Sequence, residues 1–215
     1  AIFKIGEVSI PPSSTVRNLG VIFDSQLAMD AQVTAICRSA YFQLHQIGSI
    51  RKFLNNDVTA QLIHSFVTSR LDYCNSLLFG ISKTSLKKLN RVHNTAARIL
   101  TLTRKCDHIT PILKELHWLP VQLRIEFKVL VYKCLNGKAP KYLSDLLEVY
   151  TPPRSLRSSS KQKLLKPRSY LVSFGDRAFS IAGPALWNNL PTPIKNSPSV
   201  DSFKRNLKTH LFSRF

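Results

Sequence analysis

Apolar residues follow two different spacings along this chain, and each spacing predicts a different kind of element. Residues 2–10 and 16–23 are rich in β-branched and aromatic side chains, which favour strands. The Pro-Pro-Ser-Ser segment at 11–14 separates the two runs, and proline turns a strand rather than continuing it. The pattern therefore predicts a β-hairpin at the start of the chain, with its turn at 11–14.

Amphipathic helices are predicted next, because apolar residues recur every three or four positions from Asp30 onward. We expect helices over 30–48, 56–79 and 84–102, and their short connections indicate a small bundle. The second helix is predicted to bury Leu62, Ile63, Phe66, Val67, Leu71, Cys74 and Leu78. The third is predicted to bury Leu86, Leu89, Ala96 and Leu100.

The rest of the chain predicts shorter helices and a basic, irregular segment. Helix signals continue to about residue 150, Pro and basic residues dominate 151–170, and an amphipathic helix is expected near the end, over 200–212. The predicted fold class is mainly α, with an N-terminal β-hairpin, a three-helix bundle, further helices, a basic arm and a small C-terminal helical segment. The corresponding parts are 1–28, 29–105, 106–150, a linker at 151–170, and 171–215.

The net charge of the chain indicates which kind of molecule it binds. Thirty-one Lys and Arg oppose 12 Asp and Glu, which gives a formal net charge of +19. A chain this basic gains most by neutralising a polyanion and releasing its counterions, so nucleic acid is the first candidate partner. An anionic membrane is the second, but no apolar run approaches the ~18 residues of a spanning helix. We expect no membrane partner and no secretion, because no charged-then-apolar leader opens the chain, and we interpret its start as internal to a longer protein.

Two basic clusters are the candidate nucleic-acid-binding sites. No acidic residue occurs between Tyr73 and Cys106, and Lys87, Arg91 and Arg98 lie within about 60° on the predicted third helix, opposite its apolar face. The first cluster comprises Lys83, Lys87, Lys88, Arg91, Arg98, Arg104 and Lys105. The second lies in the basic arm and comprises Arg154, Arg157, Lys161, Lys163, Lys166 and Arg168. Both predict contact with a phosphate backbone, the alternatives being a solvated helix face and a localisation signal.

The stretch SRLDYCNS at 69–76 gathers reactive side chains, but its helical phase argues against catalysis. On the predicted second helix, Cys74 points inward and Asp72 outward, whereas Arg70 falls in the apolar arc. Arg70 therefore implies a bend in the helix, an ion pair across the bundle, or a phosphate contact. We interpret these three residues as structural.

No catalytic or metal site is predicted in this chain. Sequence motifs of serine hydrolases, zinc proteases and phosphate-binding loops are missing, and no two acidic residues are adjacent. Cys106, His108, His117 and Cys134 have the side chains of zinc ligands, but their spacing matches no compact zinc finger. We expect neither an enzyme nor a cofactor here.

Several strings resemble the carboxy-terminal part of the reverse transcriptase of LINE-type, non-LTR retrotransposons. They are VRNLGVIFDSQL, HSFVTSRLDYCNSLLFG, LNRVHNTAARIL, HITPILKELHWLPVQLRIEFKVLVYKCLNGKAP and GDRAFSIAGPALWNNLP. The resemblance covers nearly the whole chain. It implies that 1–28 ends the polymerase palm, that Leu19, Gly20 and Val21 are similar to the primer grip, and that 29–105 is similar to the thumb.

The resemblance also implies what lies outside this chain. The catalytic Asp pair of the family, and the Mg²⁺ that it binds, would belong to a palm that precedes these residues. The expected function is a non-catalytic, C-terminal part of an RNA-directed DNA polymerase that binds RNA or an RNA–DNA duplex. Its partners would include the missing palm and fingers, in a nuclear or cytoplasmic ribonucleoprotein. The alternative is a relic or domesticated interaction module with no polymerase role.

Overall fold

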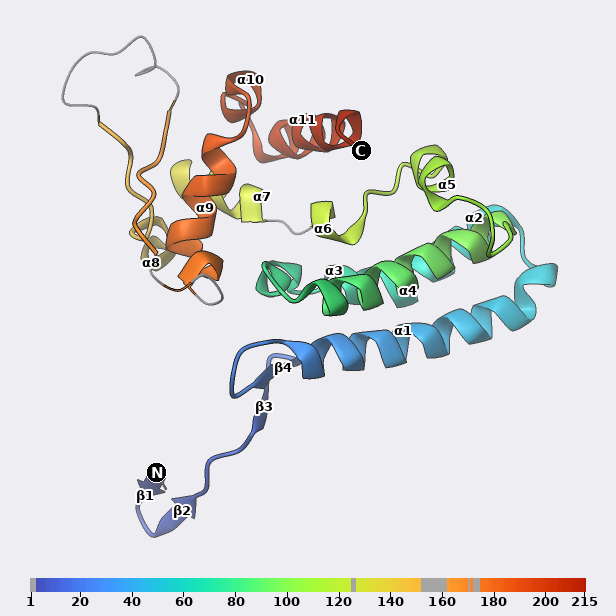
Figure 1. Ribbon diagram of the computed structural model, residues 1–215, viewed down its shortest axis with the longest axis horizontal. Helices are drawn as coiled ribbons and strands as arrows, with labels where there is room; N and C mark the ends of the chain where they lie inside the picture. The colour runs from blue at the N-terminus through green and yellow to red at the C-terminus, as the bar shows by residue number, and fades with distance from the viewer. Residues whose placement is uncertain (1–2, 125–126, 152–161, 170, 172–174) are drawn as a thin grey trace. The chain divides into compact units, whose positions relative to one another are not determined.

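The computed structural model describes residues 3–124, 127–151, 162–169, 171 and 175–215 (Figure 1). It is mainly helical with a hairpin at its start, which confirms the predicted fold class. The chain forms two compact units, Ala1–Gln122 and Leu123–Phe215, hereafter unit 1 and unit 2. The division between the units falls after Gln122.

Two separate hairpins begin unit 1, where the sequence predicted one. Their antiparallel strands are β1 (Phe3–Ile5) with β2 (Val8–Ile10), and β3 (Thr15–Asn18) with β4 (Val21–Asp24). The predicted turn at 11–14 is wrong, because each β-rich run carries its own glycine turn. Leu19 and Gly20 have φ values of 46° and 83°, the mirror-image turn that suits the twist of a two-residue hairpin loop.

The second hairpin is joined to the helices by side chains that bind backbone groups. The N–H of Ile22 donates to Oε1 of Gln32 at 2.9 Å, so a buried glutamine covers part of the edge of β4. The carboxylate of Asp24 accepts the N–H of Ala28 at 2.8 Å and that of Met29 at 2.6 Å. These bonds fix the turn that leads into the first helix.

A bundle of helices forms the core of unit 1. Its elements are α1 (Asp30–Ile50), a 3₁₀ turn (Arg51–Phe53), α2 (Asn56–Ile63), a π-helical turn (His64–Thr68), α3 (Ser69–Asp72), a second 3₁₀ turn (Asn75–Leu78) and α4 (Lys83–Thr101). Helices α1 and α4 run side by side in the same direction, since Ser85 bonds Asp30 near their starts and Ile99 lies beside Gly48 near their ends (Figure 1). Along the chain, the segment from α2 to α3 connects the end of α1 to the start of α4. Val33, Ala40, Ile63, Leu89 and Val92 are fully buried in this core.

A buried arginine ties together the ends of three elements in unit 1. Arg51 is 7% exposed, and its guanidinium donates to the carbonyls of Ile99 at 3.0 Å, Leu100 at 2.9 Å and Leu54 at 2.7 Å. It also donates to the side chain of Asn56, at the start of α2. Carbonyls in the last turn of a helix have no partner within that helix, so Arg51 caps the C-terminus of α4.

Helix α5 (Ile109–Glu115) and the segment after it complete unit 1. The Trp118 ring lies 5.4 Å from that of His64 and 5.3 Å from that of His93, between ring centroids. The N–H of Val121 donates to Oδ1 of Asn90 on α4 at 3.2 Å. These contacts pack residues 109–121 against the bundle of unit 1.

Unit 2 packs around three stacked aromatic rings. Its helices are α7 (Phe127–Leu135), α8 (Lys141–Ser144), α9 (Phe179–Asn188), α10 (Thr192–Lys195) and α11 (Val200–Ser213), with a 3₁₀ turn at Gly175–Arg177; the short α6 (Val121–Arg124) lies at the division between the units. Phe203 stacks on Tyr132 at 4.4 Å and on Trp187 at 6.1 Å, between ring centroids. The Tyr132 hydroxyl donates to the carbonyl of Ser197 at 2.6 Å, which satisfies it inside the core.

The described end of the predicted basic linker is bound to unit 2. Leu164 is 3% exposed, and its N–H and carbonyl pair with the Asn188 side chain at 2.9 and 2.8 Å. Tyr150 donates to Lys163 at 2.9 Å and Leu165 donates to Glu148 at 2.8 Å, both between backbone groups. Residues 162–165 are therefore a fixed part of unit 2. Across the described parts of both units, no helix is long and apolar enough to cross a membrane.

Arg51→Met should destabilise unit 1 by about 3 kcal/mol, since it leaves buried carbonyls of α4 without a donor. Hydrogen exchange on peptides from α1 and α4 measures this change for unit 1 by itself. Lys52→Met, at the exposed neighbour, is the matched control and should change stability by less than about 0.5 kcal/mol. Equal protection in both variants would contradict a capping role for Arg51.

Asp24 should give unit 1 a pH-dependent stability. The N–H of Ala28, aided by those of Met29 and Gln26, holds the pKa of Asp24 below its ordinary value of 3.8, against a smaller effect of desolvation. Its contribution is therefore fully present above pH 3.8 and is lost as the pH falls through the lower, folded-state pKa.

Asp24→Asn keeps a hydrogen-bond acceptor without the charge, so the stability difference between wild type and this variant should shrink as the solution is acidified. Urea unfolding across the acid range measures that difference. Glu7→Gln, in the exposed turn of the first hairpin, controls for the loss of one negative charge. A difference that stays constant with pH would contradict the argument.

Candidate nucleic-acid interface

The SRLDYCNS stretch does not continue the helix that the sequence predicts. The π-helical turn at His64–Thr68 holds more residues per turn than an α-helix and so changes the helical phase of this stretch, although Leu71 and Leu78 stay buried as predicted. Arg70 and Phe66 are exposed as a result, and Thr68 is buried instead. Of the alternatives for Arg70, a buried ion pair is excluded by the exposure of its side chain, and a distorted helix accounts for its position.

Cys74 is exposed, which contradicts its predicted place in the core. The α3 helix ends at Asp72, and Cys74 follows in the left-handed conformation with φ at 50°. Asp72 is half-buried. The sequence signal for a helix break here was weak, because apolar residues keep a helical spacing through Leu78 in the following 3₁₀ turn.

Tyr73 is the residue of this stretch that joins distant parts of unit 1. Its hydroxyl donates to the carbonyl of Leu19 at 2.7 Å, across 54 positions of sequence. The Tyr73 ring packs against Gly20, so that a Cβ atom added to Gly20 would lie 3.6 Å from Cε1 of Tyr73, in van der Waals contact. Tyr73 thus holds the tip of the second hairpin against the end of α3.

The three residues similar to a primer grip lie at that tip in different environments. The side chain of Leu19 is 83% exposed, whereas Val21 is 3% exposed and packs in the core. Gly20 occupies the left-handed conformation that the turn requires. The buried side chain of Val21 and the bond from Tyr73 therefore anchor the tip, while the side chain of Leu19 faces solvent.

Helix α4 presents basic side chains on the face opposite its core residues. Ser85, Leu89, Val92, Ala96 and Leu100 are buried, as the 3.6-residue spacing requires. The exposed cations of this helix, hereafter the α4 basic face, are Lys83, Lys87, Lys88 and Arg91. Of the predicted core residues, Leu86 is half-buried rather than buried.

Arg98 shapes a loop with its guanidinium. It is half-buried and donates to the carbonyl of Arg104 at 3.2 Å and to that of Asp107 at 2.9 Å. The Asp107 carboxylate in turn accepts the N–H of Arg104 at 3.1 Å. Arg98 therefore closes the loop after α4, which displays Arg104 and Lys105 to solvent.

A cation of the α4 basic face acts on a thiol of the neighbouring helix α1. Lys88 lies close enough to Cys37 on α1 to act on its thiol electrostatically. Burial raises the pKa of Cys37, and the positive charge of Lys88 opposes that shift. The raised pKa keeps the thiol protonated, which does not suit a nucleophile. Arg38 is exposed on the next position of α1.

The second predicted cluster is only partly described. Arg154, Arg157 and Lys161 lie outside the described residues. Lys163, Lys166 and Arg168 are exposed on unit 2, on a backbone that the Leu164–Asn188 pairing fixes.

Metal ligands do not converge in the described residues. Within them, no group of three or more His, Cys, Asp or Glu side chains is placed to hold a metal ion. Cys106 is exposed and Cys134 is buried, where burial raises the pKa of its thiol. Arg51 and Tyr73, which the sequence reasoning missed, act on backbone carbonyls and have no sequence motif.

Comparisons with protein-family models, with curated proteins and with solved structures find no match to this chain. The candidate interface consists of a one-sign helix face, a basic loop and an anchored hairpin tip within one compact unit.

Tyr73→Phe should loosen the second hairpin by about 1 kcal/mol, since it removes one hydrogen bond to a backbone carbonyl. Amide exchange of β3 and β4, followed by NMR, should speed up while exchange in α4 stays unchanged. Tyr41→Phe, at an exposed tyrosine of α1, is the matched control. Unaltered exchange in β3 and β4 would show that the ring packing alone holds the tip.

Proposed function

We propose that unit 1 binds the phosphate backbone of a nucleic acid through the α4 basic face. The observation that carries this proposal is the set of four exposed cations on one helix face, in a stretch with no acid between Tyr73 and Cys106. A solvated helix face normally carries both signs of charge, because opposite charges offset each other's repulsion. A face of one sign lowers its free energy when it meets a polyanion.

The geometry around this face suits an extended ligand. Lys83, Lys87, Lys88 and Arg91 extend along more than two turns of α4, and Arg104 and Lys105 follow on the loop that Arg98 closes. A regular helix repeats its side chains every few ångströms, as a nucleic acid repeats its phosphates, so several contacts can form at once. Contacts of this kind position a backbone and do not read base sequence.

The proposed larger role is the non-catalytic, C-terminal part of a LINE-type reverse transcriptase. The sequence resemblance and the basic unit 1 support this role. In it, unit 1 would hold RNA or an RNA–DNA duplex, while the Asp pair and Mg²⁺ belong to a palm outside these residues. The exposed side chain of Leu19, on the anchored hairpin tip, fits a contact with a primer strand.

Replacing Lys87, Lys88 and Arg91 by Gln should weaken binding to an RNA–DNA duplex and flatten its salt dependence. Each lost phosphate contact lowers the slope of log K against log salt by about 0.9, so three contacts lower it by about 2 to 3. Fluorescence anisotropy with a labelled duplex, from low to moderate salt, measures both effects.

The matched control replaces Lys4, Arg17 and Lys52 by Gln, which removes the same charge from exposed positions of unit 1. The proposal requires the control to keep a steeper slope than the α4 variant. Equal salt slopes for the two variants would mean that the weaker binding reflects only the lower net charge. The lack of any binding at moderate salt would favour the interaction-module alternative.

A further inference from the structure

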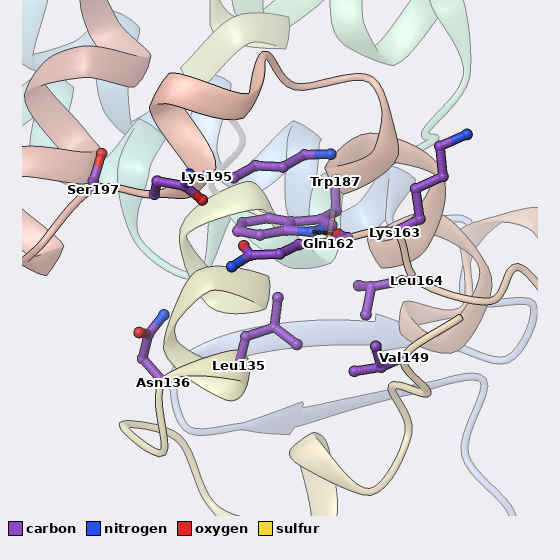
Figure 2. Close-up of a pocket in the computed structure, with 10 residues that line it drawn as sticks. Leu135, Asn136, Val149, Gln162, Lys163, Leu164, Trp187, Lys195 and Ser197 are labelled. Atoms are coloured by element: carbon purple, nitrogen blue, oxygen red, sulfur yellow. Dashed lines mark hydrogen bonds between the residues drawn. The ribbon is translucent and has the colours of Figure 1, made fainter. Parts of the chain in front are cut away.

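Two lysines of unit 2 are partly or fully withdrawn from solvent, and their surroundings differ. Lys195 lines the pocket of about 540 Å³ in Figure 2, where it is 5% exposed and its side chain runs alongside the indole of Trp187. Its ammonium lies 5.7 Å from the centroid of that ring, and the aromatic face attracts the charge. Lys128, on the first turn of α7, is half-buried, and the charge that acts on it is that of another cation, Arg214.

The packing of α7 against α11 explains how Lys128 comes to lie beside other cations. Tyr132 stacks on Phe203 at 4.4 Å between ring centroids, which joins the two helices. Lys128 precedes Tyr132 by one turn and lies on the same face of α7. At 100° per residue, His210 and Arg214 fall within about 20° of Phe203 around α11. Three basic residues therefore occupy the faces through which these helices pack.

Elsewhere on the same two faces the side chains are core residues. Val131 and Tyr132 on α7 are fully buried, and so is Phe203 on α11, with Leu207 7% exposed. The helical spacing would place further apolar side chains at the positions of Lys128 and His210, which are half-buried instead. Arg214 is exposed at the edge of this cluster. The chain thus places cations where packing alone favours apolar groups.

The three side chains repel one another electrostatically. Burial lowers the pKa of Lys128, and the positive charge of Arg214 lowers it further. Burial also lowers the pKa of His210 from its ordinary value of 6.5, and the charges of Arg214 and Lys128 add to that shift. Within the described residues, the charges that act on Lys128 and His210 are therefore positive. Partial burial of like charges is unfavourable, and an anion bound among them would offset the repulsion.

We propose that Lys128, His210 and Arg214 form a site for a phosphate monoester group, hereafter the α7–α11 basic site. Lysine and arginine together carry two positive charges, which match the nearly two negative charges of a phosphate monoester at pH 7. The guanidinium can donate to two phosphate oxygens at once, and a neutral imidazole donates one further hydrogen bond. An internal phosphodiester of a strand carries one negative charge and matches this site less well.

The phosphate group belongs either to a small phosphorylated molecule or to the phosphorylated end of a nucleic-acid strand. The charge and the donors of the site are the same for both sources. This inference does not rest on the α4 basic face, because Lys128, His210 and Arg214 all belong to unit 2.

Titration of the full chain with inorganic phosphate, followed through the imidazole signals in NMR spectra, tests the proposal. The His210 signal is assigned by its loss in His210→Gln. We expect this signal to shift saturably and the pKa of His210 to rise, because a bound anion favours the imidazolium. Sodium chloride at equal ionic strength is the control. No saturable shift up to about 10 mM phosphate, or an equal effect of chloride, would overturn the proposal.

Removal of the half-buried charge should weaken phosphate binding. Lys128→Met keeps an apolar stem of similar length and removes the ammonium, so it should raise the Kd for phosphate about tenfold. Lys204→Met, at an exposed lysine of α11, is the matched control and should bind phosphate as the wild type does. Equal Kd values for the two variants would contradict the site.

A second variant guards against a folding defect at Lys128. Arg214→Gln changes an exposed residue at the end of α11, so far-UV circular dichroism should stay unchanged while the Kd for phosphate rises about tenfold. Arg205→Gln, at an exposed arginine of the same helix, should leave the Kd unchanged. Full affinity in the folded Arg214 variant would place the phosphate elsewhere and overturn the proposal.

Oligonucleotides distinguish the two sources of the phosphate. These titrations use the Lys87, Lys88 and Arg91 variant, which should bind inorganic phosphate with wild-type affinity; a loss of that binding would overturn the assignment to unit 2. A shift of His210 by a 5′-phosphorylated oligonucleotide and not by its 5′-hydroxyl form would identify a strand end. A response to inorganic phosphate alone would identify a small phosphorylated molecule, and either result supports the site. Equal shifts by both oligonucleotides would contradict the monoester assignment.

Discussion

The guanidinium of Arg51 is the interaction on which unit 1 depends. It binds the carbonyls that end α4, the carbonyl of Leu54 and the side chain of Asn56, so the end of α1, the start of α2 and the end of α4 meet at one cation. A buried cation is costly unless its donors are satisfied, and here carbonyl dipoles at a helix C-terminus satisfy them. With the far ends of α1 and α4 fixed in this way, the parallel pair has a defined register, and the basic side chains of α4 keep defined positions.

The hairpin tip and the helix face are held by different forces, which gives them different rigidity. The α4 basic face sits on a helix whose opposite side is fully packed in the core. The tip at Leu19 and Gly20 depends on one tyrosine hydroxyl, one glutamine and the buried side chain of Val21. A segment held by few contacts opens more easily than a packed helix. Unit 1 therefore combines a rigid positive surface with an adjustable loop.

The sequence predicted the elements with an unbroken spacing and failed where local chemistry interrupts it. The buried face of α4 follows from its 3.6-residue pattern, and only Leu86 departs from it. On the predicted second helix, Val67, Leu71 and Leu78 are buried as expected, whereas Phe66 and Arg70 depart from the pattern at and after the π-helical turn, which has no sequence pattern of its own. Cys74 departs because α3 ends at Asp72. In the first 24 residues, the prediction placed one turn at the prolines, but the structure has two turns, and they lie at Gly6 and Gly20. Burial of Arg51 and Lys195 depends on tertiary contacts, and no spacing distinguishes them from the other cations.

The backbone bonds between residues 148–150 and 163–165 use one side of the Leu164 segment, and the N–H and carbonyl of Leu164 point to the other side, where both pair with the amide of Asn188. A single side chain on α9 therefore serves Leu164 as a neighbouring strand would. The bridge has its edge covered by a helix, so this part of unit 2 needs no third strand to satisfy its backbone.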